Sequence, residues 1–336
     1  MRGQNILGRV WTKNTDYAII VPSAKRTEEE RMYPFMKKIC TILLAMVLLG
    51  SAGTALADLE QNALLDAAFS AIEQDNIFQR RYNELTGSHV VSLFEQGIPY
   101  FFGGQVNYNG KLVNDKLLME DYPLYAREKC AETTKFFRTG QLYIYGFDCS
   151  GFTKWIRVKS GLKEHPGLQD MIIKHDQWQY HLYHGGTNWT SAELPMPAYD
   201  ELKDHLQVGD LLVTKHSARH IMMYIGTLAD YGFTAEEAPE LAAYLDYPLV
   251  IHCGPSPVYG ERFQQVIDAD PDRYGRCKTT NGGVEVSILG VKPEDAPYHT
   301  SVQNVDYDYF LIDGGNYLLT LRDIENASSF CWYRMP

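Results

Sequence analysis

One feature of the sequence, residues 36–57, decides which part of this chain belongs to the folded protein. The segment reads MKKICTILLAMVLLGSAGTALA, with two lysines before an apolar run and Ala-Leu-Ala at its end. A basic start, a short apolar core and an A-x-A site are the three parts of a secretory signal peptide. We therefore expect cleavage after Ala57, and we expect Met36 to be the true initiator, with residues 1–35 outside the mature protein. The alternative is an uncleaved membrane anchor, because residues 39–57 carry no charge and about 20 apolar residues span a bilayer.

Removal of this segment leaves an acidic chain. The whole sequence has 31 Lys and Arg against 42 Asp and Glu, which gives a net charge of −11. Residues 1–57 contain eight basic and four acidic residues, so their loss changes the net charge to −15. Such a charge argues against a nucleic-acid partner bound through bulk positive charge. With 45% hydrophobic and 22% charged residues, the composition excludes a largely disordered or collagen-like chain. We expect an exported globular protein with no stable membrane insertion after signal cleavage.

The cysteine content is informative because the protein is expected to leave the cytoplasm. Five cysteines remain after residue 57, which is too few for a disulfide scaffold. An odd number leaves at least one thiol free unless two chains pair. The five are Cys130, Cys149, Cys253, Cys277 and Cys331.

The order of expected elements indicates an α+β fold. From residue 58 to about 95 the apolar spacing is helical, and residues 235–244 also look helical. Short β-rich runs lie at residues 210–214, 221–225, 249–252, 308–312 and 330–334. No repeat and no Pro/Ser-rich linker divides the chain. We expect a helical lead-in at residues 58–96 and one domain with loop insertions at residues 97–336.

Cys149 lies where a loop enters a predicted amphipathic helix. The stretch Tyr-Gly-Phe-Asp-Cys-Ser-Gly-Phe at residues 145–152 precedes the remainder of the helix. The positive end of a helix favours a thiolate, and its free backbone N–H groups can bind an oxyanion. We therefore expect a nucleophilic cysteine with a lowered pKa. The alternative interpretation is a small buried cysteine in a capped helix.

Two histidines lie at strand ends further along the chain. His220 begins the apolar run at residues 219–226 and could take the thiol proton and later protonate a leaving amine. His216, four residues earlier, is the competing candidate. If the strand at residues 250–254 lies beside that of His220, we expect His252 to hydrogen-bond the far nitrogen of His220 and fix its tautomer.

Taken together, these stretches resemble the NlpC-like cysteine endopeptidases, which cut the peptide stems of bacterial peptidoglycan. The matching stretches are Ile-Pro-Tyr-Phe-Phe-Gly-Gly (98–104), Asp-Cys-Ser-Gly-Phe (148–152), Gly-Asp-Leu (209–211), His-Ile-Met-Met-Tyr-Ile-Gly (220–226) and Ile-His (251–252). The resemblance implies a papain-like fold, with N-terminal helices packed on an antiparallel sheet. It also implies a hydrolase of the cell wall, secreted or wall-associated, that needs no metal and no cofactor.

The resemblance also implies roles for individual residues. Cys149 is expected to be the nucleophile, His220 the general acid and base, and His252 the orienting residue. Three residues match positions that shape the substrate subsite for the amine of a stem peptide: Tyr100, Asp148 and Ser150. The bond expected to be cut joins γ-D-glutamate to a diamino acid, through an acyl-enzyme.

Departures from the family pattern leave alternatives open. Phe102 replaces the usual Trp or Tyr, and the segments at residues 104–145, 161–207 and 227–248 are long. These insertions bear on substrate choice. One alternative is an amidase that cuts between muramic acid and the stem with the same triad. Another is a wall-peptide-binding protein with an idle triad, and a disulfide between Cys149 and Cys130 would also end the catalytic interpretation.

Overall fold

A computed structural model describes most of the second half of the chain and parts of the first. The described residues are 61–108, 111–113, 125–126, 142–143, 145–167, 171, 179–183, 189–193, 204–215, 219–255, 268–269, 277–278, 282–302, 305–322 and 330–335. The chain divides into two compact units, residues 1–52 and 53–336, and all described residues belong to the second. The predicted signal peptide, His216 and Cys130 lie outside the described residues.

The described residues form three α-helices, and each begins after a side chain that caps it. Helices α2 (Ala63–Phe69) and α3 (Ile77–Thr86) begin after Asn62 and Asn76, whose side chains accept backbone N–H groups of the first turn. Helix α4 (Cys149–Lys159) begins after Asp148. These caps satisfy N–H groups that have no partner within the helix. The helical prediction for residues 58–95 is confirmed, and no helix in the described part of the chain is long and apolar enough to cross a membrane.

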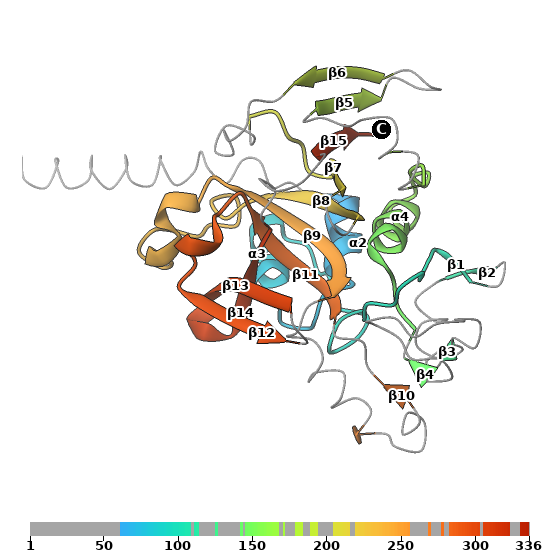
Figure 1. Cartoon of the computed structure of the whole chain (residues 1–336), viewed down its shortest axis with the longest axis horizontal. Helices are drawn as coiled ribbons and strands as arrows, with labels where there is room; N and C mark the ends of the chain where they lie inside the picture. Colours follow the sequence, from blue (N-terminus) through green and yellow to red (C-terminus); the bar gives the residue numbers. More distant parts are fainter. Residues whose placement is uncertain are drawn as a thin grey trace, which may run out of the picture. The chain divides into compact units, whose positions relative to one another are not determined.

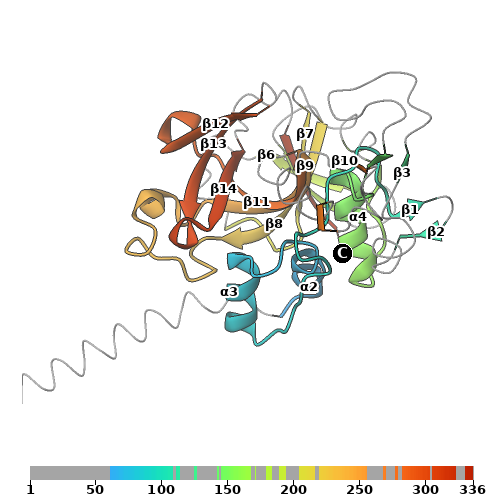
Figure 2. The ribbon, with the colours of Figure 1, turned by 90° about the horizontal axis from the view of Figure 1, so that it is seen from below.

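The main sheet has ten strands among the described residues, and the three helices lie along one side of its central strands (Figures 1 and 2). The order across the sheet is β12 (Tyr298–Val302), β13 (Val305–Ile312), β14 (Tyr317–Arg322), β11 (Gly282–Leu289), β9 (Pro248–Pro255), β8 (Arg219–Thr227), β7 (Leu211–Lys215), β15 (Phe330–Arg334), β5 (Gln179–Tyr183) and β6 (Trp189–Glu193). All neighbours are antiparallel except β11 with β14 and β15 with β5. The predicted α+β fold, with helices packed on a largely antiparallel sheet, is confirmed.

Two smaller sheets lie outside the main one. The first pairs β1 (Asn107–Tyr108) with β2 (Lys111–Leu112), and the second joins β3 (Tyr125–Ala126), β4 (Leu142–Tyr143) and β10 (Cys277–Lys278). Short 3-10 helices are formed at η2 (Pro239–Tyr244), η3 (Pro293–Asp295) and η4 (Asp313–Gly315). The helix predicted at residues 235–244 is therefore shorter: it begins with Pro239 and is a six-residue 3-10 helix, which is about two turns.

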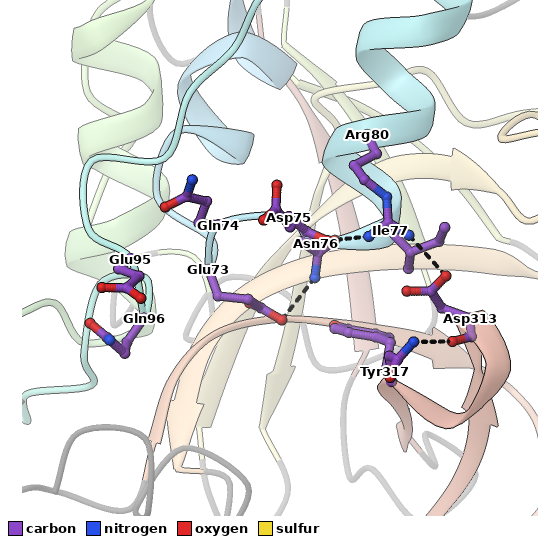
Figure 3. A pocket seen from close by; sticks show the side chains of 11 residues that line it. Glu73, Gln74, Asp75, Asn76, Ile77, Arg80, Glu95, Gln96, Asp313 and Tyr317 are labelled. Atoms are coloured by element: carbon purple, nitrogen blue, oxygen red, sulfur yellow. Dashed lines mark hydrogen bonds and ion pairs between the residues drawn. The ribbon is translucent and has the colours of Figure 1, made fainter. Parts of the chain in front are cut away.

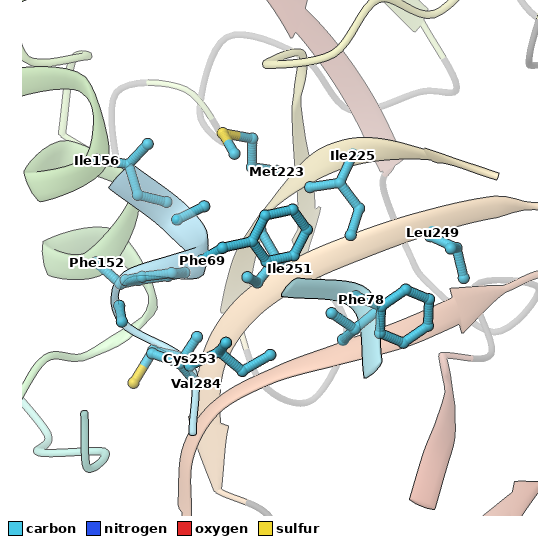
Figure 4. Close-up of a cluster of buried hydrophobic side chains, with 14 of the residues drawn as sticks. Phe69, Phe78, Phe152, Ile156, Met223, Ile225, Leu249, Ile251, Cys253 and Val284 are labelled. Atoms are coloured by element: carbon cyan, nitrogen blue, oxygen red, sulfur yellow. The ribbon is translucent and has the colours of Figure 1, made fainter. Parts of the chain in front are cut away.

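The hydrophobic core lies between the helices and the central strands (Figure 4). Phe69 of α2 and Phe152 of α4 are both fully buried. They meet a set of buried side chains from β8, β9 and β11, including Met223, Ile225, Leu249, Ile251, Cys253 and Val284. Burying each such side chain stabilises the fold by roughly 1.5–3 kcal/mol. The core therefore fixes α4, and with it Cys149, against β8 and β9.

Close backbone contacts at glycines join residues 98–105 to the start of α4. A side chain at Gly146 would lie 1.8 Å from the Pro99 carbonyl oxygen, and one at Gly151 would lie 1.9 Å from the Gly104 oxygen. The Asp148 N–H donates to Gly104 O at 3.0 Å, and Phe101 N–H donates to Phe147 O at 2.8 Å. Only glycine permits two backbones to approach this closely.

Alanine substitutions at two adjacent glycines test this contact. Gly103 has φ +82° and open space around it, whereas an added methyl at Gly104 would lie 2.2 Å from Gly146 O. We expect Gly103→Ala to cost about 1–2 kcal/mol of backbone strain, and Gly104→Ala to cost more than about 3 kcal/mol because the two backbones must separate. Free energies of unfolding from urea titration measure both. Equal losses for the two variants would contradict the contact.

Candidate active site

Cys149 is a free, partly exposed thiol at the first position of α4. The Asp148 side chain accepts the Gly151 N–H at 2.7 Å and so begins the helix. The backbone N–H groups of Ile221 and Ser150 are close enough to the sulfur to lower the pKa of the thiol. Since Ile221 follows His220 in β8, the helix end and the strand that carries the predicted base meet at this thiol. Cys149 forms no disulfide in the structure, and Cys130 lies outside the described residues.

The expectation of a lowered thiol pKa is wrong for this resting structure. Burial raises the pKa of Cys149 to about 12, and the neighbouring Asp148 carboxylate acts in the same direction. The N–H groups of Ile221 and Ser150 lower the pKa, but by less. Desolvation of the charged form therefore outweighs the helix end. The resting site holds a thiol, and the proton must leave as the sulfur attacks.

His220 and His252 lie side by side on neighbouring strands. Strand β8 carries His220 and pairs antiparallel with β9, which carries His252. The two ring centroids are 4.8 Å apart and the rings meet edge to face at 81°. The strand pairing on which the expected hydrogen bond between the histidines depended is therefore present. The predicted hydrogen bond between the rings is not formed, because the edge-to-face arrangement leaves His220 Nε2 and His252 Nδ1 without hydrogen-bond partners.

His252 is fully buried and has polar neighbours on the two strands beyond it. Ser287 of β11 lies 2.9 Å from His252 Nε2, and Arg322 of β14 donates to the same nitrogen at 3.3 Å. The Arg322 guanidinium also donates to Glu285 at 3.1 Å. Ser287 and Thr320 hydroxyls are 2.5 Å apart. The ring of His252 is thus held by polar groups from β11 and β14.

Both histidines are uncharged in this environment. Burial lowers the pKa of His220 and of His252 well below the ordinary value, and the positive charge of Arg322 lowers both further. A neutral imidazole is the form that can accept a proton from a thiol. The site therefore combines a protonated nucleophile with an unprotonated base.

The predicted subsite residues are close to Cys149 in the structure. Gln105 donates to both carboxylate oxygens of Asp148 at 2.9 Å and to Ser150 at 3.0 Å, and Ser150 donates to Asp148 at 2.9 Å. Burial raises the pKa of Asp148, while these hydrogen bonds oppose the rise. Tyr100 is buried and is joined to Phe147 by a β-bridge. Tyr100, Asp148 and Ser150 are therefore gathered around the start of α4.

A polar cavity of about 560 Å³ lies elsewhere, at the beginning of α3 (Figure 3). Its lining includes the acidic residues Glu73, Asp75, Glu95 and Asp313 and the basic Arg80, which pairs with Asp313 at 2.8 Å. None of the predicted site residues lines it. Within the described part of the chain, no group of three or more His, Cys, Asp or Glu could hold a metal ion.

Sequence reasoning missed Gln105 and the residues behind His252. The signal for the second group was present in β11, where Glu285 and Ser287 alternate with Val284, Val286 and Ile288. Such alternation in an eight-residue run predicts a strand with one polar face. Both polar side chains are nonetheless buried. The polar face of β11 therefore belongs to a buried hydrogen-bonded network and does not face solvent. Gln105 has no comparable signal.

Comparison with known families identifies the segment that carries these residues. The NlpC/P60 family model matches residues 134–230, a range that contains both Cys149 and His220. The chain carries an NlpC/P60 family domain. The NlpC/P60 fold is papain-like, in agreement with helices packed on a largely antiparallel sheet. The match is narrower than the domain predicted at residues 97–336, and His252 lies beyond it.

The family assignment gives the class of enzyme. Members of the NlpC/P60 family are cysteine peptidases that act on the cell wall, and the chain is a hydrolase of this kind. The family implies a peptidoglycan substrate and a location outside the cytoplasm. Neither the curated proteins nor the solved structures contain a match to this chain.

The raised pKa of Cys149 predicts how the thiol reacts in the absence of substrate. Alkylation by iodoacetamide follows the thiolate fraction, so we expect the rate at Cys149 to be low at neutral pH and to keep rising with pH through the alkaline range. Peptide mapping by mass spectrometry separates Cys149 from the buried Cys253, which serves as the internal control. A rate that already reaches a plateau below about pH 7 would contradict this prediction and indicate a preformed thiolate.

Proposed function

We propose that this protein is an exported endopeptidase that hydrolyses the amide bond between γ-D-glutamate and a diamino acid in peptidoglycan stem peptides. The observation that carries the proposal is the free Cys149 at the start of α4, close enough to β8 that the N–H of Ile221, directly after His220, lowers the pKa of the thiol. The family match at residues 134–230 supports the class of reaction. Export rests on the predicted signal peptide at residues 36–57, with the mature enzyme in residues 58–336.

The reaction begins from a neutral pair of residues. Cys149 Sγ attacks the carbonyl carbon while His220 takes the thiol proton, so that charge forms only as the new bond forms. The carbonyl oxygen becomes an oxyanion, for which the backbone N–H of Cys149 is the proposed donor. The C–N bond then breaks as His220 returns the proton to the leaving amine, which gives a thioester acyl-enzyme.

Hydrolysis of the acyl-enzyme restores the starting state. Water attacks the thioester carbonyl as His220 takes its proton, and the sulfur leaves and regains that proton. His252 acts on this cycle through the ring of His220, against which it packs at 4.8 Å between centroids. Its role in the proposal is to hold that ring in place.

Tyr100, Asp148 and Ser150 are proposed to bind the amine end of the stem peptide. A carboxylate pairs well with an ammonium group when water is excluded, and Asp148 lies next to the nucleophile. Gln105, which hydrogen-bonds Asp148 and Ser150, holds both in the orientation that the subsite requires. The insertions at residues 104–145, 161–207 and 227–248 are proposed to select among stem peptides.

Mass spectrometry of defined muropeptides tests the proposal. The purified protein is expected to release fragments cut between γ-D-glutamate and the diamino acid, and Cys149→Ala is expected to abolish the release because the nucleophile is lost. Cys331→Ala, which removes a buried free thiol in β15, is the matched control and should retain cleavage.

Other products would point to other functions. Release of the entire stem from the sugar, lost in Cys149→Ala, would identify the amidase. Absence of cleavage across several stem types, with Cys149 unreactive to alkylation even at alkaline pH, would contradict an enzyme and favour a wall-peptide-binding protein.

A further inference from the structure

The polar network behind His252 is built from three neighbouring strands. Glu285 of β11 lies directly opposite His252 of β9 in the antiparallel register, and Ser287 of β11 lies opposite Thr320 of β14. Arg322 is two residues beyond Thr320, so its side chain projects from the same face of β14. Along β9, His252 alternates with Ile251 and Cys253 of the hydrophobic core. The sheet thus presents one polar cluster around a single buried imidazole.

Arg322 is fixed at both ends of its guanidinium. Nε donates to His252 Nε2 at 3.3 Å, and Nη2 donates to Glu285 Oε1 at 3.1 Å. Glu285 is 2% exposed and also lies 3.7 Å from His252 Nε2. A buried carboxylate requires a cationic partner, so Glu285 keeps the arginine against the histidine.

The chemistry of the guanidinium determines the state of His252. A guanidinium carries N–H donors only and remains charged, so the nitrogen that it contacts must be an acceptor. His252 Nε2 therefore carries no proton, and the neutral ring is protonated at Nδ1. That Nδ1 and His220 Cε1 each lie 3.3 Å from the position that a side chain at Gly254 would occupy. A methyl group at residue 254 would therefore be in tight contact with both rings.

We propose that Arg322, held by Glu285, is a positioning residue for the catalytic pair: it fixes the ring of His252 and thereby the ring of His220 packed on it. This inference rests on the proposed function, because it assigns Arg322 a part in the same reaction. Arg322 acts through His252 and touches neither substrate nor thiol in the proposal.

The charge of Arg322 has a second effect on the histidines. Three titratable groups face the cluster: Glu285 from β11, His220 from β8 and Tyr307 from β13. The charge of Arg322 lowers the pKa of Tyr307, and that of Glu285 raises it. Of the charges near the rings, that of Arg322 lowers the pKa of both His220 and His252. A protonated His220 cannot accept the thiol proton. Arg322 therefore extends activity toward acidic pH.

Two substitutions separate position from charge. Arg322→Met removes the donor and the charge, whereas Arg322→Lys keeps the charge but loses the planar pair of donors. Arg334→Met is the matched control, because Arg334 also pairs with a buried carboxylate. The Arg334 side chain is 25% exposed and lies 2.8 Å from Asp210, whose side chain is 2% exposed. The corresponding side-chain exposures are 27% for Arg322 and 3% for Glu285. The Arg334 pair lies beside the beginning of β7, while His220 pairs with Thr214 near the end of that strand.

Muropeptide cleavage by each variant gives the kinetic result. We expect kcat to fall about 10- to 100-fold in both Arg322 variants because the base is misplaced, with KM little changed. In Arg322→Met the acid limb of the pH profile should move to higher pH, since the lost positive charge lets the pKa of His220 rise; in Arg322→Lys it should stay. Wild-type kcat and pH profile in Arg322→Met, or the same losses in Arg334→Met, would overturn the proposal.

Nuclear magnetic resonance of ¹⁵N-histidine-labelled protein tests the same contact without substrate. His252, assigned by comparison with His252→Gln, is expected at neutral pH as a neutral ring protonated at Nδ1, and it should titrate at higher pH in Arg322→Met. A proton on Nε2 in the wild type, or an unchanged spectrum in Arg322→Met, would overturn the proposal. A protein that cleaves no muropeptide but shows the expected spectrum would contradict the proposed function and leave the contact of Arg322 with His252 established.

Discussion

The site depends on backbone contacts between residues 98–105 and the start of α4. Carbonyl oxygens of Pro99 and Gly104 occupy the space that side chains at Gly146 and Gly151 would need. These contacts hold the loop and the helix together, and the buried side chains of α4 hold the helix against β8 and β9. The position of Cys149 beside the start of β8 follows from both. A change in either would separate the nucleophile from the strand that carries the proposed base.

Burial then decides the protonation states. The thiol of Cys149 lies at a helix N-terminus with N–H groups around it, yet desolvation keeps it protonated. The same desolvation keeps His220 and His252 neutral, and Arg322 adds to the effect. An uncharged resting pair avoids burying an isolated charge, and in the proposed mechanism the thiol proton moves to His220 when the substrate carbonyl is attacked. Charge is therefore formed in the transition state, where the backbone N–H groups can stabilise it.

Much of this arrangement could be predicted from the sequence. The helix after Asp148 and the strands that carry His220 and His252 follow from local patterns, because capping and apolar runs are properties of neighbouring residues, whereas the pairing of the two strands does not. The protonation state of the thiol could not be predicted, since burial of Cys149 decides it and burial is a property of the folded chain. Strand β11 was missed although Glu285 and Ser287 alternate with apolar residues, and only the structure shows that these two polar side chains are buried. The absence of a hydrogen bond between the histidine rings could not be predicted either. It follows from the position of Arg322, which donates to His252 Nε2 from β14, on the side away from His220.

The central claim is that Cys149 and His220 form one reactive pair. A bifunctional alkylating agent, 1,3-dibromoacetone, tests it directly, because it joins a thiol to an imidazole only when the two groups are adjacent. After treatment at mildly alkaline pH, where more of the thiol is ionised, peptide mapping by mass spectrometry is expected to recover the Cys149 peptide bridged to the His220 peptide. Cys149 modified without a bridge, or bridged to a histidine other than His220, would contradict the account.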